Sequence, residues 1–122
     1  MTSKEEQFLS LVIKAMNNKN LIQFVYENKL IIIEPFLVGE LYSKFENHLV
    51  EGAYAVRGWL VRGYSSKNLD VKKGDRWRIY ELDKMSDLLI LNETFYDARP
   101  LYNPDDSSFK RINLRMEIIK LR

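Results

Sequence analysis

Two short stretches of the sequence carry an arginine and a tyrosine two residues apart. They are Arg62 with Tyr64, and Arg78 with Tyr80. A guanidinium group binds phosphate oxygens through paired hydrogen bonds. A tyrosine ring can stack on a nucleobase, which contributes about 1–3 kcal/mol. Arginine beside aromatic rings therefore predicts a site for a phosphate together with a base.

The two stretches can form one surface if both are neighbouring β-strands, because side chains alternate between the two sides of a strand. The candidate ligand-binding residues are then Arg62, Arg78, Tyr64, Tyr80, Tyr26 and Lys84. The other interpretation is that the tyrosines pack in the interior, while the arginines pair with Glu34, Glu81 or Asp83. The tryptophans, Trp59 and Trp77, are expected in the core or in a dimer interface, since large aromatic side chains mostly serve packing.

Periodicity places one helix at the N-terminus. Ser3 and Glu6 have the spacing of a capping box, in which a hydroxyl and a carboxylate bond the first turn. Apolar residues follow at helical spacing: Phe8, Leu11, Val12, Ala15 and Met16. We expect a helix over about residues 3–17.

The rest of the chain has the apolar patterns of β-strands. Strands are expected at 21–26, at 30–41 with a bend at Pro35, and at 53–64, 76–82, 85–91 and 111–118. Gly58 and Gly63 are positions where the long strand can kink. One helix followed by five or six strands predicts a mainly β fold. We expect a small barrel over about residues 20–95, followed by an irregular segment and an extra C-terminal strand over about 96–122.

Several blocks resemble the signature of the WYL domain, and together they cover about residues 11–95. The block WLVRGY at 59–64 resembles the run that names the family, and RIYELDKM at 78–85 resembles its second block. Upstream, IQFVY at 22–26 and Glu34-Pro35 are similar to its first two strands, and Phe95 to its last aromatic position. The name-giving Tyr and Leu are here Leu60 and Val61, and Ile31–Ile33 replace the arginine that usually precedes the proline.

The resemblance implies an SH3- or Sm-like barrel of about five strands with an N-terminal helix. It also implies a ligand-sensing domain of bacterial transcription regulators, several of which bind single-stranded nucleic acid. The DNA-binding helix-turn-helix that usually accompanies such domains is not expected here, because a single helix cannot form one.

Composition and charge indicate how many domains the chain forms, where it is located and which kind of partner it binds. At 122 residues the chain has the size of one domain, residues 1–122, and it contains no cysteine. It has neither the apolar run of about 18 residues that a membrane helix needs nor a signal-like N-terminus. We expect a cytoplasmic protein with no membrane contact. Residues 57–78 carry seven basic side chains against two acidic ones, and 109–122 carry five against one, which favours an anionic partner on one face.

No arrangement of residues predicts catalysis. His48 is the only histidine and lies in a polar stretch, and no nucleophile-elbow motif is present. Asp105-Asp106 lacks the spaced ligands of a calcium loop, and the five glycines form no phosphate loop. We therefore expect a protein that is not an enzyme and that has no metal or cofactor.

The C-terminal strand is amphipathic, because Ile112 and Leu114 alternate with Arg111 and Arg115. A lone strand must pair with something. It can extend its own sheet or pair with a second copy, and we predict a homodimer through this strand.

A hydrolase would need His48 and has no support from the sequence, and two other functions remain open. The first is a non-catalytic regulatory module that binds single-stranded nucleic acid or a nucleotide-like anion. The second is a protein-interaction adaptor that docks on a separate regulator or nuclease subunit. The adaptor predicts an exposed apolar patch around Phe36, Leu37 and the C-terminal strand.

Overall fold

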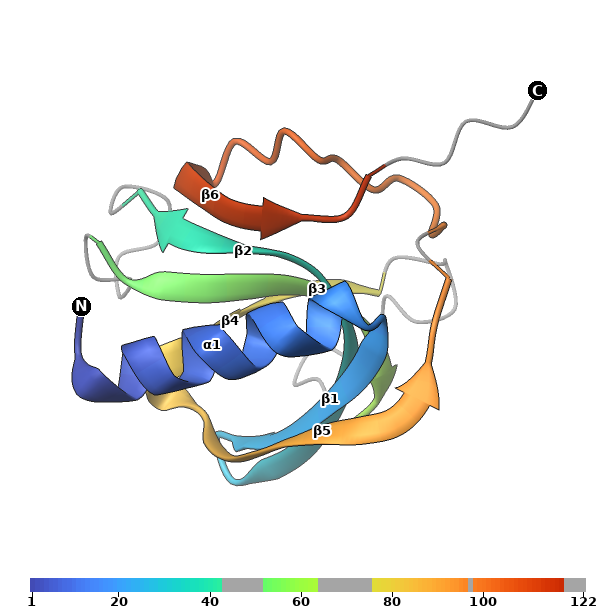
Figure 1. Cartoon of the computed structure of the whole chain (residues 1–122), viewed down its shortest axis with the longest axis horizontal. Helices are drawn as coiled ribbons and strands as arrows, with labels where there is room; N and C mark the ends of the chain where they lie inside the picture. The colour runs from blue at the N-terminus through green and yellow to red at the C-terminus, as the bar shows by residue number, and fades with distance from the viewer. Residues whose placement is uncertain (43–51, 64–75, 97, 118–122) are drawn as a thin grey trace.

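The computed structural model describes residues 1–42, 52–63, 76–96 and 98–117 (Figure 1). The elements are α1 (Ser3–Asn17), β1 (Asn20–Tyr26), β2 (Lys29–Leu41), β3 (Tyr54–Arg62), β4 (Trp77–Glu81), the 3-10 helix η2 (Leu82–Lys84), β5 (Ser86–Thr94) and β6 (Phe109–Arg115). The expected mainly β fold with one N-terminal helix is confirmed. Tyr64, His48 and most of the polar stretch that follows β3 lie outside the described residues.

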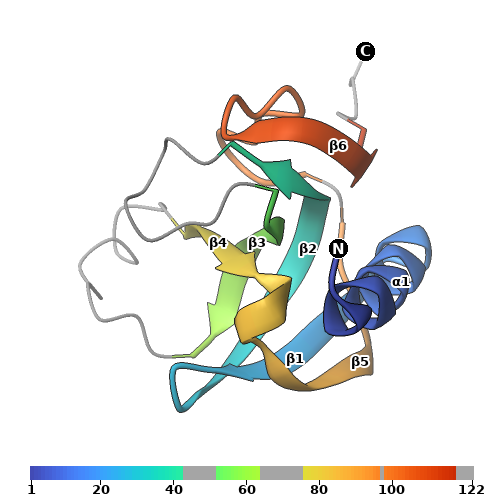
Figure 2. The ribbon, with the colours of Figure 1, turned by 90° about the vertical axis from the view of Figure 1, so that its left-hand side faces the viewer.

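The strands form one antiparallel sheet in the order β4-β3-β2-β1-β5, and β6 pairs with β2. The sheet curls strongly, as the end-on view shows (Figure 2). It does not close into the predicted barrel, since β4 and β5 at the two ends of the path share no ladder in the described part of the chain. The short helix η2 connects them instead and turns the chain from one edge of the sheet to the other.

Strand β2 holds the sheet together, because its two halves have different neighbours on one edge. Its first half pairs with β1, with Ile33 opposite Ile22, and its second half pairs with β6, with Val38 opposite Leu114. Strand β3 runs along the other edge of both halves. The register between β2 and β3 shifts between Pro35 and Leu37, which agrees with the bend expected at Pro35, a residue with no N–H to donate.

Helix α1 begins one residue earlier than its predicted capping box. The cap is Thr2, whose hydroxyl accepts from the Glu5 N–H at 3.0 Å, while the Glu5 carboxylate accepts from the Thr2 N–H at 2.9 Å. The second carboxylate oxygen of Glu5 accepts from the Tyr54 N–H of β3 at 3.0 Å. This third bond ties the first turn of the helix to the sheet and explains why the carboxylate of Glu5 is buried.

The core lies between α1 and the concave side of the sheet. The helix contributes Leu9, Val12, Ala15 and Met16, which pack against Ile22 and other buried strand residues. The exposed apolar patch expected around Phe36, Leu37 and the C-terminal strand is wrong at Phe36 and Leu37, because both side chains are fully buried. Phe36 packs in the main core, and Leu37 joins Phe109 in a smaller cluster under β6. No helix in the described part of the chain is long and apolar enough to cross a membrane.

Candidate ligand-binding site

Two of the candidate tyrosines lie together but are used in packing. The rings of Tyr26 and Tyr80 meet edge to face, with centroids 4.9 Å apart, and Tyr80 also packs against Phe24 at 5.1 Å. Tyr80 is only 8% exposed, and burial raises its pKa to about 12. Burial also raises the pKa of Tyr26, whose hydroxyl oxygen accepts from the Glu81 N–H. Packing thus encloses the Tyr80 ring, whereas the Tyr26 ring is half-buried.

Lys84 has an internal partner. Its ammonium group pairs with the Glu81 carboxylate at 3.0 Å, and this bond raises the pKa of Lys84 above its ordinary value. Arg78 lies near these residues on β4, opposite Gly58, and donates to the Trp77 carbonyl at 2.8 Å. The structure thus groups Tyr26, Tyr80 and Lys84 where β1 and β4 end, and Arg78 lies two residues before Tyr80 on β4.

Arg62 lies apart from that group. It ends β3 opposite Ile32, is exposed, and has no ion-pair or hydrogen-bond partner among the described residues. Arg78 pairs with Gly58, further back along the same strand. The predicted meeting of Arg62 with Arg78 is therefore not direct.

Arg76 lies closer to Arg62, and it was not among the candidate site residues. The Leu60 N–H donates to the Arg76 carbonyl at 2.8 Å, which sets Arg76 opposite Leu60. Diagonal neighbours across an antiparallel pair have Cβ atoms about 7–8 Å apart, and Arg62 occupies that position relative to Arg76. The guanidinium of Arg76 donates to the carbonyls of Leu60 and Val61. The sequence did contain a signal for Arg76: it lies two residues before Arg78, so both side chains lie on the same side of a strand. We call Arg62, Arg76 and Arg78 the arginine face.

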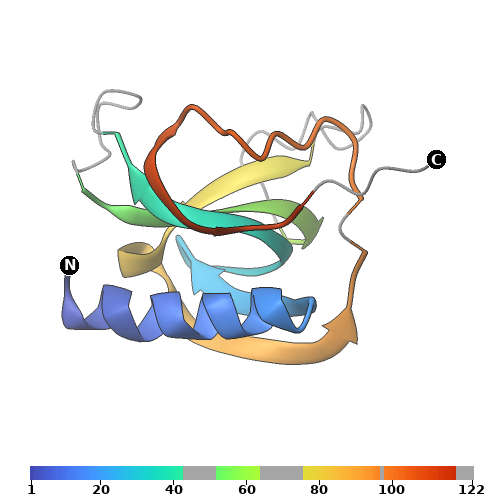
Figure 3. The ribbon, with the colours of Figure 1, turned by 45° about the horizontal axis from the view of Figure 1, so that its top comes forward.

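The segment 98–108, which we call the strap, covers the opposite side of β3 and β4 (Figure 3). Arg99 grips the buried Glu34 carboxylate with two hydrogen bonds, one of them 2.7 Å long, and lies over the Trp59 ring at 5.0 Å. The Trp77 indole N–H donates to the Pro100 carbonyl at 2.8 Å. The strap is thus fastened by residues whose partners lie far away in sequence, which alternation alone does not reveal.

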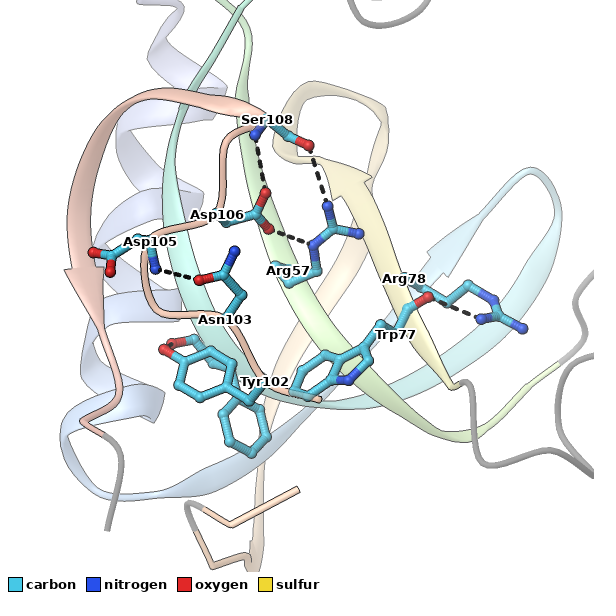
Figure 4. A network of polar contacts seen from close by, with 9 residues as sticks. Arg57, Trp77, Arg78, Tyr102, Asn103, Asp105, Asp106 and Ser108 are labelled. Atoms are coloured by element: carbon cyan, nitrogen blue, oxygen red, sulfur yellow. Dashed lines mark hydrogen bonds and ion pairs between the residues drawn. The ribbon is translucent and has the colours of Figure 1, made fainter. Parts of the chain in front are cut away.

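A pocket of about 220 Å³ opens between the strap and the two strands. It is lined by Arg57, Trp77, Leu101, Tyr102, Asn103 and Asp106. The Trp77 and Tyr102 rings stack with centroids 5.6 Å apart. Figure 4 shows Arg57 pointing toward Asp106 and Ser108, whereas Arg78 extends away from the pocket.

The polar end of the pocket is electrically compensated. Arg57 donates to the Asp106 carboxylate at 2.7 Å, and the other oxygen of Asp106 accepts from the Ser108 N–H. Such a pair presents N–H donors and carboxylate acceptors together without net charge. Among the described residues, no group of three or more acidic or histidine side chains could hold a metal ion. The chemistry available here is hydrogen bonding and stacking.

Comparisons with known proteins give no match: neither a family model, nor a curated protein, nor a solved structure is similar to this chain.

Proposed function

We propose that this chain is a non-catalytic regulatory module that binds single-stranded nucleic acid or a nucleotide-like anion through the arginine face. One observation supports it most. Arg62 is exposed with no partner in the described part of the chain, and Arg76, its diagonal neighbour, bonds only backbone carbonyls there. Two guanidinium groups without a carboxylate partner attract phosphate more strongly than arginines already held in ion pairs.

The charge distribution along the sequence supports the same function. The basic stretch 57–78 includes all three residues of the arginine face, and the acidic excess lies elsewhere. A cationic strand edge contacts the phosphate backbone whatever the bases are. The proposed module therefore binds single strands with little sequence preference and with a strong dependence on salt.

The double variant Arg62→Ala/Arg76→Ala tests this function. Each phosphate contact to a single strand contributes a slope of about −0.7 to a plot of log binding constant against log salt. We expect the double variant to bind a labelled oligothymidylate about tenfold more weakly at low salt, with a slope less steep by about 1.4. Fluorescence anisotropy over a salt series measures both quantities.

The matched control is Lys14→Ala/Arg115→Ala. It removes the same charge from α1 and β6, and Arg115 is already paired with Asp105 at 3.0 Å. We expect its salt slope to equal that of the unmodified protein. If the unmodified chain binds no oligonucleotide or nucleotide at low salt, or if the control weakens binding equally, the proposal is wrong.

The kinship with WYL domains is part of this proposal, together with a cytoplasmic role in bacterial transcription regulation. It is supported by the order of one helix followed by the six strands of the sheet, and by the location of residues 59–62 of the WLVRGY block on β3 and of residues 78–84 of the RIYELDKM block from β4 through η2. The proposed homodimer uses β6, which pairs with β2 along one edge and has no second strand partner in the described ranges. The adaptor alternative loses Phe36 and Leu37 from its predicted surface, because both are buried, whereas Ile112 and Leu114 on β6 are only partly buried.

A further inference from the structure

The pocket beneath the strap is too small for a large ligand. Sites for drug-sized molecules have volumes of about 300–1,000 Å³, and this pocket has about 220 Å³. Its walls come from two strands and from the strap, so its width is fixed by the bonds that hold Arg99 and Trp77. The space suits a single ring system.

The aromatic wall of the pocket offers ring surface and not hydrogen-bonding groups, because the polar atoms of Trp77 and Tyr102 are already bonded elsewhere. The Trp77 N–H donates to Pro100, and the Tyr102 hydroxyl donates to the Met116 carbonyl at 2.7 Å. Burial raises the pKa of Tyr102 to about 12, so this phenol stays neutral at physiological pH. Neutral aromatic faces accept a flat apolar partner by stacking.

The polar end of the pocket favours a neutral ligand with a hydrogen-bonding edge. The compensated Arg57–Asp106 pair gives a phosphate or an ammonium group little net attraction. Asn103 lies beside it, and its side-chain oxygen accepts from the Asp105 N–H at 3.0 Å. The NH₂ group of this amide, beside the Arg57 donors and the Asp106 acceptor, can donate to the edge of a nucleobase.

An exposed leucine stands at the rim of the pocket. Leu101 lies in a turn, has a φ of +64° and is 86% exposed. Leucine at this position gains nothing from core packing, but its side chain extends the apolar wall of the pocket.

We propose that this pocket binds a neutral planar heterocycle of the nucleobase type. The inference rests on the proposed function, because it adds a base site to the phosphate contacts of the arginine face. The two sites lie on opposite sides of the β3–β4 pair, and β4 is the edge strand of the sheet. A single strand can therefore pass over that edge, with its phosphates near Arg76 and one base beneath the strap.

Free nucleosides test the pocket without engaging phosphate contacts. We expect adenosine, guanosine, cytidine or uridine to quench tryptophan fluorescence and to shift the backbone amide resonances of residues 101–106. The variant Leu101→Gly/Asn103→Ala should bind about tenfold more weakly, because it loses one apolar wall and one hydrogen-bonding edge. Glycine accepts the positive φ of Leu101, so the fold is kept.

The control Leu89→Ala/Asn113→Ala alters an exposed leucine on β5 and an exposed asparagine on β6. It should bind nucleosides as the unmodified chain does, and so should Arg62→Ala/Arg76→Ala. If no nucleoside shifts residues 101–106 while oligonucleotide still binds, the pocket inference is overturned and the arginine face stands. If nucleosides bind and oligonucleotides do not, the proposed function fails instead. Equal nucleoside binding by the pocket variant would also overturn the inference.

Discussion

At the scale of single residues, burial decides what a tyrosine can do. Tyr26 and Tyr80 have the residue types and the strand positions of a stacking site, yet their rings contact each other and Phe24 in the interior. The aromatic residues that line the pocket are Trp77 and Tyr102, on the other side of the strands. Alternation tells which residues share a side, but not which side is covered.

The buried phenol of Tyr80 makes stability depend on alkaline pH. Its folded pKa of about 12 lies above the ordinary value of 10.0, so the folded state holds the proton more tightly. This contribution is complete below about pH 10 and is lost as pH rises toward 12, by on the order of 2 kcal/mol. We expect Tyr80→Phe to retain more of its unfolding free energy than the unmodified chain between these pH values, measured by urea unfolding.

The control for this titration is Tyr96→Phe, because the Tyr96 side chain is 86% exposed and contacts water in both states. Its pH profile should follow that of the unmodified chain. A Tyr80→Phe profile that is parallel to the unmodified one throughout the alkaline range would contradict the burial argument.

At the scale of elements, one ion pair fastens the strap to the sheet. Glu34 is 4% exposed, and in the described chain its carboxylate is paired with Arg99. Removing one partner of a buried pair leaves a charge without compensation, which is more costly than losing an exposed pair. The bond to Glu34 also raises the pKa of Arg99, so this guanidinium group keeps its charge throughout the physiological range.

We expect Arg99→Ala to lower the free energy of unfolding by about 2–3 kcal/mol, because Glu34 loses its cation. Arg99→Lys should recover only part of this loss, since a single ammonium group cannot replace the two-pronged contact. Urea unfolding measures both changes. Arg115→Ala is the control, because Asp105 is 83% exposed and such pairs contribute about 0–1 kcal/mol. An Arg99→Ala effect no larger than that of Arg115→Ala would show that the pair does not hold the strap.

The contact between β2 and β6 depends on a glycine. A Cβ atom at Gly39 would collide with the Arg111 carbonyl oxygen and would lie 2.9 Å from the Ile112 Cα. Both are backbone atoms and cannot rotate away. We expect Gly39→Ala to displace β6 and to destabilise the chain by about 1–3 kcal/mol, with faster amide exchange over 109–115.

The control for Gly39→Ala is Lys110→Ala, which shortens an exposed side chain on the same strand. Its amides should exchange as in the unmodified chain. If the amides of β6 remain equally protected in Gly39→Ala, the close approach of the two strands is not required for their pairing.

At the scale of the whole molecule, local patterns predicted the elements better than their contacts. Alternation and helical spacing gave the helix and the strands because both depend on near neighbours in sequence. Thr2 with Glu5 and Ser3 with Glu6 have the same spacing, so spacing alone could not tell which pair caps the helix. The bond from Tyr54 to Glu5 involves the first of these pairs, but it joins residues distant in sequence. The pairing of Arg99 with Glu34 joins residues 65 positions apart, so neither the strap nor the pocket beneath it was visible in the sequence. Whether the sheet closes into a barrel likewise depends on how far β4 and β5 curl toward each other, which near neighbours in sequence do not determine.

The double pairing of β2 has a consequence for the order in which the chain is made. A ribosome releases β2 and β3 long before β6, which reaches the second half of β2 from far along the sequence. Until then the N–H and C=O groups of residues 37–41 on that edge lack their native partner, and such an edge can pair with another nascent chain. Synthesis of β6 therefore ends the period in which this protein is most exposed to aggregation.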